Sequence, residues 1–160
     1  MPKQLNLRES QQDATARPQA DDQASALGVQ IAGQNWLVDM LDISGVLPLP
    51  PLTPVPLTRP WFLGVVNVRG MLYGVTDVAA YQQKGKAPAT AANRILLVAE
   101  RHASNTALLV DCVLGSRNVR AWAQDEVQGQ IQYRDEGGGV WHKLDMVDLL
   151  SQPDFLQISV

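Results

Sequence analysis

The chain has 160 residues, of which 46% are hydrophobic and 18% are charged, enough apolar material for one domain or for two small subdomains that share a core. Thirteen Lys and Arg against sixteen Asp and Glu give a net charge of −3, which argues against nucleic-acid binding because no broad cationic surface can form. No apolar run approaches the roughly 20 residues of a membrane helix, and the first 25 residues contain no signal-peptide core, so we expect a cytoplasmic protein with no direct membrane insertion.

The composition changes near the N-terminus. Residues Met1 to Ala26 are dominated by Gln, Asp, Ala and Ser and contain no aromatic residue. Such a segment buries too little apolar surface to offset the entropy lost when a chain becomes ordered. We therefore predict a disordered tail over residues 1–26 and one folded domain over residues 27–160.

The folded part is predicted to begin with a hairpin followed by a connector. The stretch "LGVQIAGQNWLVDML" turns near Gly33 and places Trp36, Val38 and Met40 on one face of its second strand. Between residues 48 and 60 there are six prolines in thirteen residues. This density excludes a helix or a central strand, because each proline lacks an amide donor and restricts its predecessor.

The next segment, "RPWFLGVVNVRGMLYGVTDV", predicts a second hairpin. Two runs rich in Val, Leu, Phe, Tyr and Met flank Arg69 and Gly70, the pattern of two buried strands joined by a tight turn. Arg69 is therefore expected at the tip. One interpretation is that it merely solvates the turn, and the other is that it serves recognition.

The rest of the chain predicts more strands and one short helix. The polar segment Tyr81 to Asn93 suits an exposed loop, and we interpret it as the boundary between two halves. Beyond it, closely spaced apolar runs predict further antiparallel hairpins, as in a β-sandwich or barrel rather than alternating βαβ units. A helix is expected over Asp145 to Gln152, because apolar residues recur there at helical spacing and Pro153 would end it.

No pattern of catalytic or metal-ligating residues is visible. His102 and His142 have no partner at ligand spacing, and Cys112 lies in an apolar strand without a basic neighbour. The glycines of "EGGG" lack the Lys-Ser or Lys-Thr and the helix start of a phosphate loop. The carboxylates at strand edges are expected to be solvated or to cap turns: Asp39, Asp42, Asp77, Asp111 and Asp145. We therefore expect no cofactor, no metal and no enzymatic activity.

Aromatic residues gather near the predicted turns, and their role stays open. Either they fill two small cores, or some of them line a protein-binding face, where Trp, Tyr and Arg concentrate binding energy. They are Trp36, Trp61, Phe62, Tyr73, Trp122 and Trp141.

The second hairpin carries a resemblance to a known family. It resembles the most recognisable block of the CheW-like coupling proteins of bacterial chemosensory systems, through Gly64, Val65, Asn67, Arg69, Gly70, Val75 and Asp77. The stretches "DISGVLPLP", "RILLVAE", "ALLVDCVLG" and "VWHKLDMVDLL" look like further blocks of the family, so the resemblance covers roughly Leu27 to Leu150. The proline-rich connector with Arg-Pro-Trp-Phe-Leu-Gly is similar to PilI-type adaptors of type IV pilus, twitching-motility systems. The chain departs from the family pattern at Gly45, Gly74 and Val78, where glutamate, proline and leucine are usual.

The resemblance implies a mainly β fold, with two packed five-stranded SH3-like β-barrels and a short C-terminal helix. It also implies a non-catalytic adaptor that bridges the cytoplasmic tip of a methyl-accepting chemoreceptor to the regulatory, CheW-like domain of a histidine kinase, recruited to membrane-associated receptor arrays. The partner-binding residues implied are Arg69, which would contact the receptor tip, Asn67, Val68 and Gly70 in the same turn, and Ile43 and Val46, which would supply apolar contact.

Two alternatives remain open at this point. One is an SH3-like module that binds proline-rich peptides through the aromatic residues around Trp61. The other is a coupling protein of flagellar chemotaxis.

Overall fold

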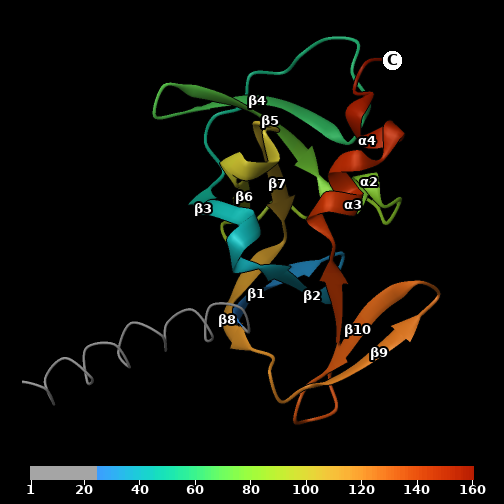
Figure 1. Cartoon of the computed structure of the whole chain (residues 1–160). Coiled ribbons are helices and arrows are strands. Elements are labelled where there is room, and N and C mark those ends of the chain that lie inside the picture. The colour runs from blue at the N-terminus through green and yellow to red at the C-terminus, as the bar shows by residue number, and fades with distance from the viewer. Residues whose placement is uncertain (1–24) are drawn as a thin grey trace, which may run out of the picture.

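The computed structural model describes residues 25–160 as two β-sheets with short helices at their edges (Figure 1). In chain order the strands are β1 (Ser25–Ile31), β2 (Gln34–Asp39), β3 (Ile43–Pro48), β4 (Phe62–Val68), β5 (Met71–Asp77), β6 (Arg94–Val98), β7 (Thr106–Val110), β8 (Cys112–Asn118), β9 (Ala123–Val127), β10 (Gln130–Arg134) and β11 (Val140–Leu144). The helices are α2 (Val78–Tyr81), α3 (Met146–Ser151) and α4 (Pro153–Leu156), with 3-10 turns η1 (Met40–Asp42) and η2 (Glu100–His102).

The strand orders are β8-β1-β2-β11-β10-β9 and β3-β6-β7-β5-β4. The expected mainly β fold with two packed sheets is thus confirmed, with six strands in one sheet where the resemblance implies five. Pairing is antiparallel except between β11 and β2 and between β5 and β7. In the part of the chain that the structure describes, no helix is long and apolar enough to cross a membrane.

The first hairpin forms as predicted, with one correction at each end. β1 begins at Ser25, so the last two residues of the predicted tail are in a strand, and the rest of that tail lies outside the described residues. β2 ends at Asp39, so Met40 does not share a strand face with Trp36 but is 42% exposed. The carboxylate of Asp39 accepts a hydrogen bond from the backbone of Leu41 at 2.9 Å, which starts η1 and ends the strand.

The proline-rich connector joins the two edges of the five-stranded sheet. β3 and β4 are opposite edge strands, and the connector that follows β3 bridges β4 through two hydrogen bonds of 2.9 Å between Thr53 and Val65. This approach requires a glycine beside the bridge. Gly64 has φ +136°, and a Cβ there would lie 2.4 Å from the carbonyl oxygen of Thr53. The closed, barrel-like form of this sheet therefore depends on Gly64.

Gly74, one of the departures from the family pattern, also has a local reason. Its backbone N–H donates to the carbonyl of Asn105 at 3.0 Å, and a Cβ at this position would lie 2.9 Å from the ring of Phe62. A proline would lose the hydrogen bond and collide with the ring.

The segment from Tyr81 to Asn93 is an exposed loop over most of its length, but the prediction that it separates two halves is wrong. The loop joins β5 and α2 to β6, and β5 and β6 belong to the same sheet. Asp77 holds its start, since its carboxylate accepts hydrogen bonds from the backbones of Ala80 at 3.2 Å and Ala87 at 2.9 Å. The chain instead changes sheets at η1 and at Asp111, between β7 and β8.

One hydrophobic cluster joins the two sheets and the helices. It contains side chains from β1 and β2, from β6 and β7, and from α2, β11, α3 and α4: Leu27, Val29, Ile31, Trp36, Val38, Val78, Ala79, Leu96, Val98, Leu108, Val110, Leu144, Met146, Leu149 and Phe155. A second cluster lies inside the five-stranded sheet and a third around Trp141. Trp36, Tyr73 and Trp141 are buried in these cores, whereas Trp61, Phe62 and Trp122 are only half-buried.

The predicted C-terminal helix is confirmed as α3. The Asp145 carboxylate accepts a hydrogen bond from the backbone of Asp148 at 3.1 Å and thereby caps the helix N-terminus. Pro153 ends α3 as expected and also starts α4, where its missing N–H costs nothing.

The β10–β11 turn is organised by one carboxylate. Asp135 accepts hydrogen bonds from the backbones of Gly137 at 3.0 Å and Gly139 at 2.7 Å, and from the indole of Trp141 at 3.0 Å. The indole hydrogen bond, followed by the backbone ones, lowers the pKa of the Asp135 carboxyl below its ordinary value. The charged carboxylate therefore couples the turn to the tryptophan core.

The Gly64→Ala substitution tests the closure of the five-stranded sheet. Because the new Cβ would collide with the backbone at Thr53, we expect the free energy of unfolding in urea to fall by about 2–4 kcal/mol. Gly45→Ala is the matched control, since its Cβ would meet only the Leu97 side chain at 3.4 Å, and it should change stability by less than about 0.5 kcal/mol. Equal stability of the two variants would contradict the bridge between Thr53 and Val65.

The turn around Asp135 should respond to acid. A pKa lowered by folding gives stability that is present above the unfolded pKa, near 3.8, and that is lost as the pH falls through the folded pKa. In a pH titration followed by NMR, we expect the Trp141 indole N–H to lose its hydrogen-bonded shift in acid. Asp135→Asn should remove this titration, and Glu136→Gln in the same turn should leave it unchanged. A titration that persists in Asp135→Asn would assign it to another group.

Candidate functional site

The β4–β5 turn presents Arg69 at its tip. Arg69 has φ +52° and Gly70 has φ +83°, the two positive values of a type I′ turn, whose twist suits a two-residue hairpin. The side-chain carbonyl of Asn67 accepts a hydrogen bond from the Gly70 backbone at 2.9 Å. The Asn-x-Arg-Gly motif thus builds its own turn, and the strands on either side pair from Val68 and Met71 back to Phe62 and Thr76.

The side chain of Arg69 is exposed and forms no hydrogen bond or ion pair within residues 25–160. A non-glycine residue in the left-handed region costs roughly 1 kcal/mol. The turn therefore carries a small backbone penalty and leaves an unpaired cation in solvent.

The other predicted site residues divide into packed and exposed ones. Val68 packs against the second core, and Ile43 packs against the shared core. Val46, on edge strand β3, is 40% exposed, and Asn67 and Gly70 are exposed as well. The packed side chains of Val68 and Ile43 hold the strands in place. The exposed residues are accessible to a binding partner.

Two exposed apolar residues beside Arg69 were missed in the sequence. Met71 and Leu72 follow the turn, and Leu72, at 59% exposed, is paired with Asn67. Strand alternation is the signal that could have found Leu72, because Tyr73 and Val75 point into the barrel and residue 72 must point out.

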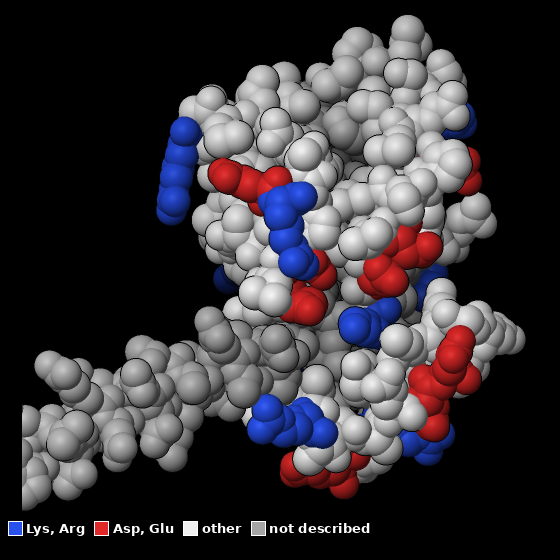
Figure 2. All heavy atoms as spheres, in the orientation of Figure 1, with Lys and Arg blue, Asp and Glu red and all other residues white. Residues whose placement is uncertain are grey.

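A separate cleft of about 1140 Å³ lies between the six-stranded sheet, the helices α2 and α3, and the segment around Trp61. Trp36, Trp61, Tyr81 and His142 supply aromatic lining, and none of the six predicted site residues lines it. Figure 2 shows acidic and basic side chains of both signs across this face rather than one charged field. Arg69 is not among the residues that line this cleft.

The loop after α2 contacts the six-stranded sheet at the cleft. The Lys84 ammonium donates to the Gln34 side chain at 2.8 Å and lies 5.4 Å from the centre of the Trp36 ring, which is 5.0 Å from the His142 ring. Burial, with a smaller contribution from Lys84, lowers the pKa of His142. His142 is therefore held more strongly in its neutral form than an ordinary histidine.

The far wall of the cleft is an aromatic cluster. The Trp61 ring stacks on Phe155 at 6.0 Å and meets the edge of Tyr81 at 5.1 Å. Burial, then the charges of Asp154 and Asp148, raise the pKa of Tyr81, whose hydroxyl donates to the side chain of Gln152. Trp61 is thus engaged mainly with its own chain.

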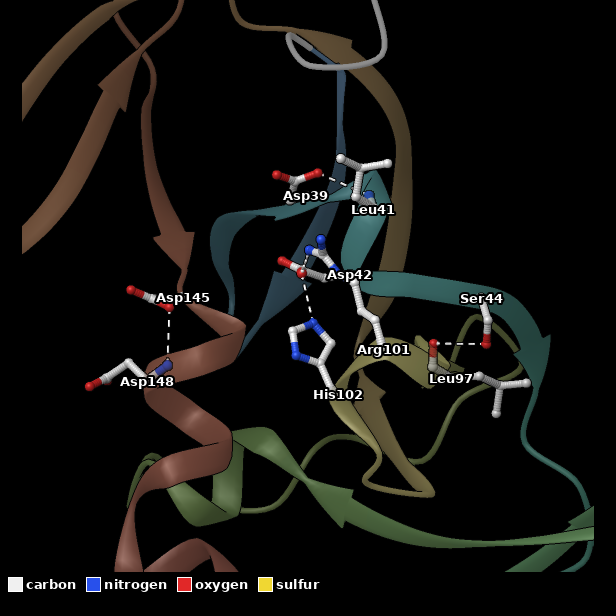
Figure 3. Close-up of polar contacts among 9 residues, drawn as sticks. All are labelled: Asp39, Leu41, Asp42, Ser44, Leu97, Arg101, His102, Asp145 and Asp148. Atoms are coloured by element: carbon white, nitrogen blue, oxygen red, sulfur yellow. Dashed lines mark hydrogen bonds and ion pairs between the residues drawn. The ribbon is translucent and has the colours of Figure 1, made fainter. Parts of the chain in front are cut away.

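A polar cluster around the buried carboxylate of Asp42 joins η1 to η2 (Figure 3). Asp42 accepts a hydrogen bond from the guanidinium of Arg101, and its Oδ1 lies 2.8 Å from Nε2 of His102. The partners are 59 and 60 residues apart in sequence, so no local pattern could have predicted the cluster. It fixes the point where the chain passes from β2 to β3.

The polar side chains singled out in the sequence stabilise turns and strands within the fold. Asp39, Asp77 and Asp145 cap helical turns, as expected. Cys112 lies 3.5 Å from the side-chain oxygen of Gln30. Within residues 25–160, no three His, Cys, Asp or Glu side chains come together in a group that could hold a metal ion.

Comparison with known proteins gives consistent results. A family model described as CheW-like domain matches residues 25–152. Protein PilI of Pseudomonas aeruginosa is 29% identical over 103 residues, which cover 64% of this chain and 57% of that protein. A probable chemotaxis protein CheW of Rhizobium etli is 30% identical over 88 residues, which cover 54% of this chain and 56% of that protein. The matches therefore span somewhat more than half of the length of these two curated relatives.

A solved structure shares the fold. The scaffolding protein TtCheW from Thermoanaerobacter tengcongensis superposes with a TM-score of 0.66 and 17% identity, over 77% of this chain and 84% of that one. Because the family model matches most of the chain and the solved structure shares its fold, this protein belongs to the CheW-like domain family.

Proposed function

We propose that this chain couples a methyl-accepting chemoreceptor to a histidine kinase in the chemosensory system that controls type IV pilus twitching motility. The observation that carries the proposal is the exposed, unpaired Arg69 on a turn that Asn67 and Gly70 hold rigid. Membership of the CheW-like family and the similarity to a protein named PilI support it.

Arg69 is proposed as the anchor for the cytoplasmic tip of the receptor. A guanidinium presents a planar fork of donors that fits carboxylates and carbonyls on a helical tip. Its position on a strained turn means that the side chain reaches solvent without a competing partner in the described chain. Rigid presentation lowers the entropy that binding costs.

The apolar part of the same site is proposed to come from the neighbouring strands. Val46 and Leu72 are exposed and can contact the receptor directly. Ile43 and Val68 pack into the cores and hold β3 and β4 beneath the contact surface. This arrangement places one charged anchor, of a residue type that is enriched at binding hot spots, beside exposed apolar side chains.

Coupling requires a second partner, for which we propose the CheW-like regulatory domain of the kinase. An adaptor transmits a signal only if its two binding sites favour kinase-on and kinase-off states differently. The chain is proposed to act in the cytoplasm, recruited to membrane-associated receptor arrays by these contacts.

The assignment to the pilus system, rather than to flagellar chemotaxis, rests on the proline-rich connector and on the relative named PilI. Deletion of the gene should abolish twitching motility on agar and leave flagellar swimming intact. Complementation with the wild-type gene is the control. Loss of swimming with normal twitching would transfer the adaptor to the flagellar system.

Substitution of Arg69 tests the receptor contact. We expect Arg69→Gly to weaken binding to the purified receptor tip about thirtyfold or more, because loss of such an anchor costs about 2 kcal/mol. Stability in urea should not fall, since glycine adopts this φ without strain. Arg69→Lys should bind more weakly than wild type, because lysine lacks the planar fork.

Lys86→Ala, which removes an exposed cation from the loop after α2, is the control and should bind normally. Undiminished binding by a folded Arg69→Gly variant would remove Arg69 from the receptor site.

A further inference from the structure

One lysine side chain links the two sheets at the cleft. The loop after α2 lies between β5 and β6 of the five-stranded sheet, and its Lys84 donates to the side chain of Gln34 on β2, in the six-stranded sheet, at 2.8 Å. The same ammonium lies over the ring of Trp36, 5.4 Å from its centre. We call these two contacts of Lys84 the lysine clasp.

The backbone of this loop is fixed, but the clasp is held weakly. The backbone N–H of Lys84 donates to Ala79 at 2.9 Å, and that of Ala87 donates to the carboxylate of Asp77 at 2.9 Å. The Lys84 side chain is exposed and forms no ion pair within residues 25–160. One hydrogen bond and one cation–π contact in reach of water each contribute little. The side chain can therefore leave Trp36 while the loop stays folded.

A histidine contacts the same indole as the clasp. His142 of β11 is paired with Trp36 of β2, and the two ring centres are 5.0 Å apart. The imidazole is half-buried, and this burial together with the charge of Lys84 lowers its pKa. A neutral imidazole is compatible with the ammonium. An imidazolium would bring a second positive charge to the same indole, and the two charges would repel each other.

Within the six-stranded sheet, the neighbours of His142 do not offset such a charge. Its partners on the adjacent strands are Trp36 on β2 and Gln132 on β10, and neither of them titrates. Beyond Gln132, Asp125 on β9 forms an ion pair with Arg134 at 3.7 Å. The carboxylate in this row of residues is thus already paired.

Across the cleft, Lys84 is the charge that acts on His142. The carboxylate of Asp42 is engaged by Arg101 and His102. The other charged or titratable side chains that line the cleft, apart from Lys84 and those of β11, are Asp39, Arg59, Tyr81, Asp145, Asp148 and Asp154. Lys84 contributes to the lowered pKa of His142, and none of these six does. Movement of the exposed Lys84 side chain is therefore the direct way to relieve the repulsion.

The closed clasp also coincides with an unpaired buried donor. Trp36 is only 5% exposed, and its indole N–H forms no hydrogen bond within residues 25–160. An unpaired buried donor costs free energy, whereas an indole N–H that water reaches does not carry this cost. This reduces the free-energy difference between the closed clasp and an open one.

We propose that the lysine clasp is a pH-sensitive cover over Trp36 in the cleft, closed while His142 is neutral and opened when His142 binds a proton. Opening breaks the hydrogen bond between Lys84 and Gln34, releases the ammonium into solvent and uncovers the indole. The device belongs to the chain itself, so it does not depend on whether Arg69 binds a receptor.

The experiment is an NMR titration of the full chain from about pH 8 to about pH 5, the range in which histidine titrates. Lys84 side-chain protons that lie over the indole should resonate upfield and show NOE contacts to the Trp36 ring at the higher pH. We expect both signals to be lost as the pH falls, with the midpoint of the His142 imidazole. That midpoint should lie below 6.5, because the folded chain disfavours the imidazolium.

Three variants isolate the two side chains. His142→Gln should keep the clasp closed at every pH. Lys84→Met should raise the pKa of His142 towards its ordinary value, because removal of a neighbouring cation favours the imidazolium. Lys86→Met removes another exposed cation from the same loop, and as the matched control it should titrate like wild type. Light scattering at each pH separates opening from association, since the net charge vanishes near pH 5.2.

Three results would overturn the proposal. In the first, the Lys84 signals stay unchanged while His142 titrates, so protonation does not open the clasp. In the second, His142→Gln opens with the wild-type midpoint, so another group drives the opening. In the third, Lys84→Met leaves the pKa of His142 unchanged, so the two side chains do not interact.

Discussion

Burial of one hydrophobic core between the two sheets is the constraint on which the rest of this structure depends. Val29 and Val38 from one sheet and Leu96 and Leu108 from the other are members of the same cluster. Because the chain changes sheets at η1 and again at Asp111, neither sheet can be removed without exposing the core of the other. The shared core makes a rigid platform, and burial of apolar area is the main source of its stability.

The packed platform allows exposed turns to keep backbone conformations that are unfavourable on their own. Arg69 and Leu57 both occupy left-handed backbone, and both turns are fixed by specific hydrogen bonds, from Gly70 to Asn67 in one case and from Val160 to Leu57 in the other. The local cost of strain and exposure is offset by the core beneath.

Local features were predictable because their causes are local. The Arg69–Gly70 turn follows from neighbouring residues in the sequence, and the caps at Asp39 and Asp145 follow from a side chain and the backbone two or three residues later. The prediction for Met40 failed for a local reason, because the Asp39 cap ends the strand one residue earlier. The boundary predicted at residues 81 to 93 failed for a long-range reason, because β5 pairs with β7 across that loop.

The residues alone were enough to predict the hairpins, the proline-rich connector, the final helix and the resemblance to a coupling-protein family, since these depend on apolar periodicity, turn chemistry and one compact motif. The folded chain was needed to reveal the strand order, the pairing of Asp42 with Arg101 and His102, the cleft lined by Trp61 and the exposure of Leu57. Each of these joins residues far apart along the chain. These long-range contacts form only when the whole core packs together. No short stretch of residues contains the information that determines this packing.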